Sequence, residues 1–198
     1  MRVNRMLAGL LFAIALVGPA AAAEDTHAED RKALIQVFRE IEAGINDQNV
    51  DRMVAQMAPE ATVTWLNAEV SRGHEQIKAY YHRMVKGENR ILDRYTTAAK
   101  LGASARFYGN GLVAVADGTM ADAFFPVARG PFRLDSNWTS TSVKIDGQWK
   151  VVSMHLSSNV FTNSLLDEAK QMVFYAGGGG VLAGLVLAWV VGRLRRRT

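Results

Sequence analysis

The sequence contains no cysteine among its 198 residues. This absence excludes a disulfide framework, a thiolate nucleophile and a cysteine-ligated zinc site. No two histidines stand on one element at a spacing that would bind a metal, so we predict neither a metal nor another cofactor. Internal repeats and low-complexity tracts are also lacking. The length then predicts one domain with additional segments at its ends.

The central part of the chain lacks an excess of positive charge. The formal net charge is +4, but six of the 23 basic residues lie before residue 24 or after residue 192. Residues 24–192 therefore carry 17 basic and all 19 acidic side chains, a net charge of −2. This balance provides no basic surface for phosphate groups and argues against nucleic-acid binding.

The first 23 residues match a secretory signal peptide. Arg2 and Arg5 precede an apolar run, and Ala21, Ala22 and Ala23 come directly before Glu24. The run is short for a bilayer span of about 20 residues, and small residues before Glu24 are typical of a cleavage site. We therefore predict that residues 1–23 are removed after export. An uncleaved N-terminal anchor is the alternative.

A second apolar run lies near the C-terminus, at residues 172–192. It contains no charged residue and is long enough to cross a bilayer as a helix. An arginine cluster follows in the tail, residues 193–198, and such clusters stay in the cytoplasm. We predict a single-pass inner-membrane protein with its domain outside, in the periplasm, and residues 163–171 as connector. A buried helix of a soluble core is the alternative.

The predicted span carries small residues at every fourth position, namely Gly180, Gly184, Ala188 and Gly192. A ridge of small side chains lets two membrane helices approach closely. It therefore predicts packing of two spans in a homodimer. The alternative is that glycine and alanine are simply common in spans.

Residues 24–162 show helical periodicity first and strand patterns afterwards. Helices are predicted over residues 30–46, 50–57 and 74–86, the first from an apolar stripe of Leu34, Val37, Phe38, Ile41 and Ile45. Strands joined by glycine-containing turns are predicted at 62–66, 69–72, 93–107, 112–124, 132–145 and 149–158. This order predicts an α+β domain, in which a cone-shaped, curved antiparallel sheet packs on three N-terminal helices.

The last predicted strand, residues 149–158, has two unlike faces. Simple alternation places Trp149, Ser153 and His155 on one side, with Met154 and Leu156 on the other. The second side is apolar and suits packing under helices. Because the first side combines an aromatic ring with an imidazole and a hydroxyl, we predict that it forms a wall of a lined cavity.

Four segments of residues 28–162 resemble the nuclear transport factor 2-like superfamily in its SnoaL-like branch. They are the end of the first helix with its strand, "INDQNVDRMVAQMAPEATVTW", then "VSRGHEQIKAYYHRMV", the four-strand meander, and "DGQWKVVSMHLSSNVF". The resemblance implies a conical half-barrel closed by three helices, with a pocket in the cone and frequent dimerisation through the outer face of the sheet. The superfamily holds isomerases, cyclases, dehydratases, ligand binders and dimerisation modules, so function must be argued from the site.

The candidate ligand-binding residues are Trp65, Tyr80, Tyr81, Trp138 and His155. Aromatic side chains with a few polar groups are the usual lining of a small-molecule pocket, although each aromatic residue could equally be core packing. His155 could bind a ligand or act as an acid or base, and a structural histidine is the alternative. No catalytic residue is assigned.

The sequence is compatible with three functions. The first is a membrane-anchored, outward-facing module that binds a small hydrophobic molecule or a partner without catalysis. The second is an enzyme of isomerase, cyclase or dehydratase type. The strand residues Asp93, Asp117, Asp122, Tyr95 and Tyr108 do not match the ketosteroid isomerase pattern, but a carboxylate that points into the cone within hydrogen-bond reach of His155 or a tyrosine would favour catalysis. The third is a dimerisation module with a vestigial pocket.

Overall fold

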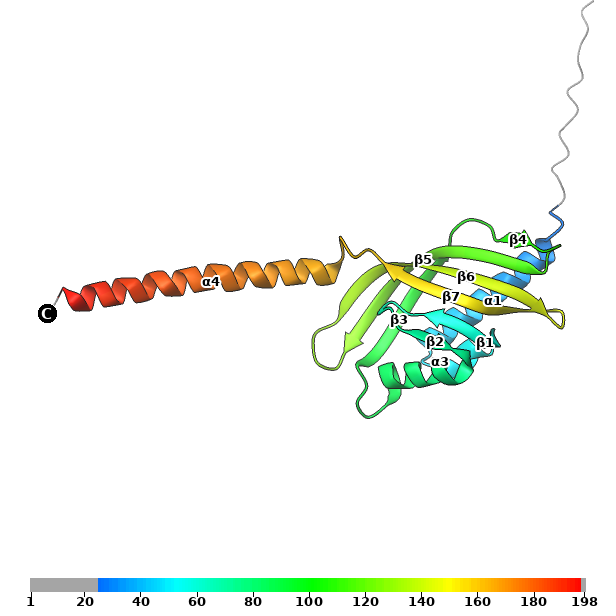
Figure 1. The fold of residues 1–198 in the computed structure, drawn as a ribbon, viewed down its shortest axis with the longest axis horizontal. Coiled ribbons are helices and arrows are strands. Elements are labelled where there is room, and N and C mark those ends of the chain that lie inside the picture. The colour runs from blue at the N-terminus through cyan, green and yellow to red at the C-terminus, as the bar shows by residue number, and fades with distance from the viewer. Residues whose placement is uncertain (1–24, 197–198) are drawn as a thin grey trace, which may run out of the picture.

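The structure is a computed structural model that describes residues 25–196, so the predicted signal peptide lies outside the described residues. Helices precede and interrupt the sheet, and a longer helix ends the described chain (Figure 1). The helices are α1 (Ala28–Asn46), α2 (Val50–Val54), α3 (Gly73–Tyr81) with its π-helical continuation η1 (His82–Lys86), and α4 (Ser164–Arg195). The strands are β1 (Met57–Thr64), β2 (Val70–Arg72), β3 (Leu92–Leu101), β4 (Arg106–Tyr108), β5 (Val113–Pro126), β6 (Phe132–Ile145) and β7 (Gln148–Ser158).

The strands form one curved sheet in the order β2-β1-β7-β6-β5-β3, with β4 paired to β5. Its concave face wraps around α1, as Figure 1 shows. The predicted α+β cone is confirmed, with one refinement. The sheet is mixed, because β1 pairs in parallel with β7 while the other pairs are antiparallel. The last strand thus closes the sheet against the first.

The apolar stripe predicted for the first helix is confirmed, since all five of its residues face the interior of the cone. The predicted second helix is too long: α2 ends at Val54, and β1 already begins at Met57. Pro59 is tolerated in β1 because the register with β7 is irregular between Met57 and Thr62. The N–H group that proline lacks is not needed there for a hydrogen bond between the two strands. The predicted strand 93–107 is divided into β3 and β4.

Helix α4 is the one described helix that is long and apolar enough to cross a membrane, and none of its apolar stretch is buried in the domain. That exposure argues against a buried core helix. The helix begins before the predicted span, where the Asn163 side chain accepts a hydrogen bond of 2.9 Å from the amide of Leu166. An ion pair between Arg129 and Glu168 joins its first turns to the β5–β6 loop.

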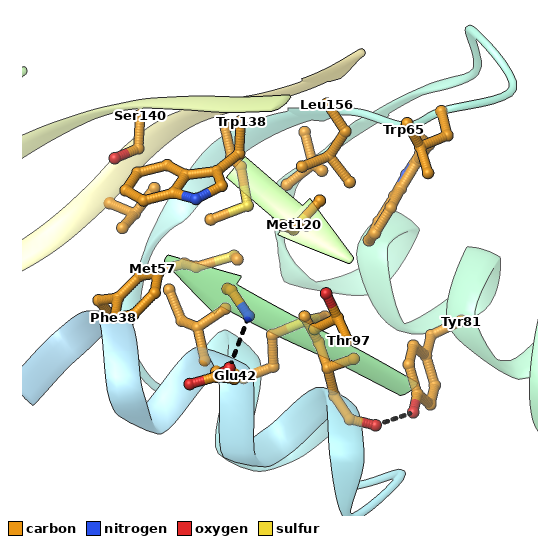
Figure 2. A pocket seen from close by; sticks show the side chains of 18 of the residues that line it. Phe38, Glu42, Met57, Trp65, Tyr81, Thr97, Met120, Trp138, Ser140 and Leu156 are labelled. Atoms are coloured by element: carbon orange, nitrogen blue, oxygen red, sulfur yellow. Dashed lines mark hydrogen bonds between the residues drawn. The ribbon is translucent and has the colours of Figure 1, made fainter. Parts of the chain in front are cut away.

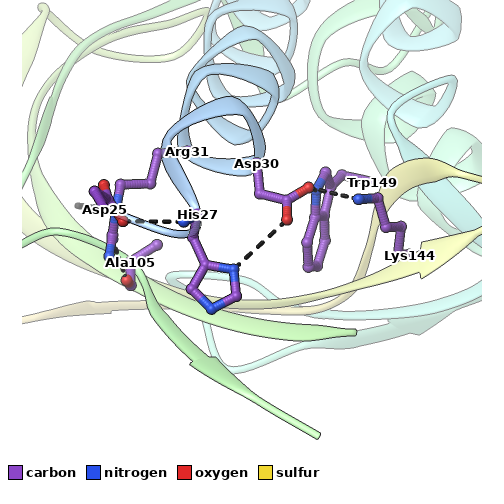
Figure 3. A network of polar contacts seen from close by, with 7 residues as sticks. All are labelled: Asp25, His27, Asp30, Arg31, Ala105, Lys144 and Trp149. Atoms are coloured by element: carbon purple, nitrogen blue, oxygen red, sulfur yellow. Dashed lines mark hydrogen bonds and ion pairs between the residues drawn. The ribbon is translucent and has the colours of Figure 1, made fainter. Parts of the chain in front are cut away.

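A polar network ties the start of α1 to the β6–β7 hairpin, at the end of the cone opposite α4 (Figures 1 and 3). The Asp30 carboxylate accepts hydrogen bonds from Trp149 Nε1 at 2.9 Å and from Lys144 Nζ at 2.6 Å. The His27 ring stacks on Phe107 with 4.2 Å between centroids. These contacts join α1 to three strands and stabilise the distal end of the cone.

Replacing Asp30 with asparagine should destabilise the domain by about 1 kcal/mol at pH 7, since a charge-assisted contact to Lys144 is lost. The Lys144 ammonium and then the Trp149 N–H hold the pKa of Asp30 below its ordinary value of 3.8. A lowered folded-state pKa stabilises the fold above the unfolded-state pKa, and this contribution is lost as the pH falls through the folded-state pKa. Urea denaturation at several pH values should show the two proteins converging below about pH 3.8. A difference that does not depend on pH would contradict this interpretation.

Candidate functional site

The interior of the cone contains a cavity of about 130 Å³ between α1, α3 and the concave face of the sheet (Figure 2). Apolar side chains from both layers line it, among them Leu34, Phe38, Met57, Met120, Met154 and Leu156. In another protein, an apolar cavity of about 150 Å³ binds benzene. The space therefore suits a molecule about the size of a single ring.

Four of the five sequence-predicted residues, Trp65, Tyr80, Tyr81 and Trp138, line this cavity. Trp65 follows β1 and stacks on Tyr80 of α3, with 4.2 Å between ring centroids and 8° between planes. Trp138 projects from β6 and stacks on Phe38 of α1 at 5.3 Å. The aromatic side chains thus come from opposite layers and meet across the cone.

His155 does not line the cavity, so the placement predicted for it is wrong. Its side chain is exposed on the outer face of β7, where His155 pairs with Thr139. The reason is a β-bulge: Thr141 pairs with Ser153 while Ser142 pairs with Val151. The extra residue reverses the alternation halfway along the strand. Trp149 and Val151 point inward before the bulge, and Met154 and Leu156 point inward after it.

A few polar groups interrupt the apolar lining. Glu42 of α1 accepts a hydrogen bond of 2.8 Å from the backbone amide of Ala99 on β3, as Figure 2 shows. Burial raises the pKa of both Tyr80 and Tyr81 to about 12, so both phenols stay neutral at pH 7. Lysine, arginine and histidine are absent from the described residues that line the cavity. The site is therefore unsuited to an anionic ligand.

Tyr95 lines the cavity from β3, and its hydroxyl donates a hydrogen bond of 2.7 Å to the carboxylate of Asp122 on β5. Ser136 of β6 donates a second hydrogen bond to this carboxylate, and Asp122 is only 1% exposed. Burial first, and then the Asp122 charge, hold the pKa of Tyr95 well above its ordinary value. Sequence reasoning considered both residues but did not bring them together, because their pairing depends on the register of β3 against β5.

Gly118 of β5 was missed by sequence reasoning. The Trp138 indole lies over it, so that a Cβ at Gly118 would be 2.7 Å from Trp138 Nε1. A glycine in the interior of a strand is a signal of such close approach. Gly118 therefore sets the position of the ring that covers this side of the cavity.

No protein-family profile matches the sequence, and no curated protein matches it either. Solved structures do match. One is a candidate scytalone dehydratase of Novosphingobium aromaticivorans, with 15% identity over 69% of this chain and 88% of the other, at a TM-score of 0.58. Another is hexachlorocyclohexane dehydrochlorinase LinA-type3 of Novosphingobium barchaimii, with 15% identity over 68% and 90% at a TM-score of 0.59.

A third similar structure is a candidate calcium/calmodulin-dependent protein kinase II association domain of Xanthomonas campestris. It has 19% identity over 72% of this chain and 95% of the other, at a TM-score of 0.54. At these identities the similarity shows a shared fold alone. The domain has the nuclear transport factor 2-like fold that the resemblance predicted. Because enzymes and an association domain share it, the fold does not select a function.

Proposed function

We propose that this protein is a membrane-anchored module, facing outward into the periplasm, that binds a small apolar molecule in the cone without transforming it. The apolar cavity is the observation that carries the proposal. An enclosed apolar space with a few convergent polar groups is the usual form of a small-molecule site. Because the cavity is large enough to hold a ring, it also favours a binding function over a dimerisation module with a vestigial pocket.

The position of the cavity relative to α4 supports a role at the membrane surface. Trp65 and Leu66 follow β1, and β1 runs parallel to β7, the strand that leads into α4 (Figure 1). This end of the cavity therefore lies on the same side of the domain as α4. Helical residues between Ser164 and the predicted span would cover roughly 12 Å, so the domain would lie near the lipid headgroups. Apolar molecules that partition into lipid would then be available nearby.

Dimerisation remains a proposal. The small-residue ridge of Gly180, Gly184, Ala188 and Gly192 is exposed on α4, where its glycines meet no described side chain within 4 Å. Such a surface suits a second copy of the same span. A homodimer would place two cavities beside each other at the membrane.

A second candidate function, acid–base catalysis on a molecule in the cone, is favoured by the Tyr95–Asp122 hydrogen bond. Two features make it the weaker proposal. Asp122 is covered and does not itself line the cavity. The Tyr95 proton is directed to Asp122 and away from a bound molecule, and its raised pKa opposes use of the phenol as a base.

Replacing Ala116 with leucine should weaken binding of toluene at least tenfold, because Ala116 lines the cavity and leucine adds three carbon atoms to it. The matched control is Ala121→Leu, on the exposed outer face of the same strand, which should change binding less than twofold. Toluene would be titrated into the full chain in nanodiscs, followed by the methyl resonances of the methionines and corrected with empty nanodiscs. Equal binding by both variants would reject the cavity as the site.

A further inference from the structure

The indole N–H of Trp138 has no hydrogen-bond partner within residues 25–196. The other two indoles of the domain do have one. Trp65 Nε1 donates to Ser71 Oγ at 2.8 Å, and Trp149 Nε1 donates to Asp30 Oδ1 at 2.9 Å. Trp138 is only 5% exposed, so bulk water does not replace the missing acceptor. A buried donor without an acceptor is uncommon and unfavourable.

The ring is held in this position and is not free to find another acceptor. It stacks on Phe38 on one side, and Gly118 lies beneath its nitrogen. Figure 2 shows the nitrogen on the edge of the ring that faces the interior of the cavity. An indole nitrogen only donates hydrogen bonds. An acceptor inside the cavity would therefore complete this hydrogen bond.

A second buried polar atom in the cavity also lacks a partner in the described part of the chain. This atom is Thr97 Oγ1, on a side chain that is 6% exposed and contributes to the lining. A hydroxyl group either donates or accepts, so it is compatible with several groups on a ligand. Trp138 sets the stricter requirement, because its N–H group can only donate a hydrogen bond and therefore needs an acceptor on the ligand.

The charge of the lining restricts the acceptor further. Glu42 contributes a carboxylate, and lysine, arginine and histidine are missing from the described lining residues. A carboxylate or phosphate brought into this space would lose its hydration without gaining a cationic partner. These features favour a neutral acceptor, of which an oxygen is the commonest.

From these observations we propose that the cavity binds a compact, neutral, mainly apolar molecule with one acceptor oxygen, a carbonyl, ether or hydroxyl group, which accepts a hydrogen bond from Trp138 Nε1. This inference rests on the proposed binding function and specifies the ligand class of the same cavity. The apolar lining binds the hydrocarbon part, and Trp138 fixes the orientation of the oxygen.

The test compares cyclohexanone, which carries a neutral acceptor, with toluene, which has the same number of non-hydrogen atoms and no such oxygen. In the full-length protein in nanodiscs, cyclohexanone should move the Trp138 indole N–H resonance downfield, and toluene should not. The indole resonances of Trp65 and Trp149 are internal controls, since both already have acceptors. Trp138→Phe changes the shape of the cavity for both probes, but it should weaken cyclohexanone binding about fivefold more than toluene binding, the effect of one net hydrogen bond.

The outcomes separate the two proposals. Binding of both probes without a shift of the Trp138 N–H resonance, or an equal loss of both in Trp138→Phe, would overturn the acceptor proposal and leave apolar binding intact. Absence of binding of either probe to the wild-type protein would overturn the binding function itself. The resonance measurement uses the wild-type protein, so the test stands even when Trp138→Phe does not fold.

Discussion

Replacing Gly118 with alanine will destabilise the domain by about 3 kcal/mol, the upper part of the range for overpacked interiors. A Cβ at this position would lie 2.0 Å from the backbone oxygen of Lys100 and 2.7 Å from Trp138 Nε1. The first of these atoms belongs to β3, whose Leu101 pairs directly with Gly118. Relief would require separation of two paired strands, and such a movement also displaces Trp138 from Phe38.

The measurement is urea denaturation of the full chain followed by tryptophan fluorescence, together with a thermal melt that should fall by about 10 °C. Gly130→Ala is the matched control, because Gly130 lies in an exposed loop where a Cβ would meet nothing within 4 Å. It should change stability by less than about 0.5 kcal/mol. Equal stability of the two variants would mean that β3 and β5 tolerate separation at Gly118, and that Trp138 is not positioned by this glycine.

The first helix and the inner face of β6 could be predicted because the side-chain periodicity of each is uninterrupted in the sequence. Leu34, Phe38 and Ile41 follow the helical period and do face the cavity. Trp138 follows the strand period and also faces inward. In these elements the local periodicity agrees with the burial of the side chains in the folded protein. The inner face of each element can therefore be predicted from that element alone.

His155 could not be placed in this way because the bulge in β7 depends on the partner strand. The residues around it, from Val151 to Met154, include no glycine or proline that would mark an irregular position. The extra residue is visible only in the pairing of β7 with β6. The same limit applies to Glu42, whose partner amide belongs to Ala99 on another element.

Replacing Asp122 with alanine is the second change with a large expected effect, a loss of about 3 kcal/mol. The hydroxyl groups of Tyr95 and Ser136 both donate to this carboxylate, and its removal takes away the acceptor that they share. Each such group costs about 1–3 kcal/mol. Chemical denaturation at pH 7 measures the loss directly. A loss below about 1 kcal/mol would mean that water or another group replaces the carboxylate.

The control is the triple variant Tyr95→Phe/Asp122→Ala/Ser136→Ala, which removes both donors together with their acceptor. It should be more stable than Asp122→Ala by about 2 kcal/mol, because neither hydroxyl group is then left without its acceptor. The triple variant should also bind toluene as the wild-type protein does, since the substitution of Tyr95 removes only its hydroxyl and keeps the ring that lines the cavity. Those two results would assign the network to holding β3, β5 and β6 together. If the triple variant were no more stable than Asp122→Ala, the hydroxyl groups would not depend on the carboxylate for stability, and the proposed structural role of the network would be rejected.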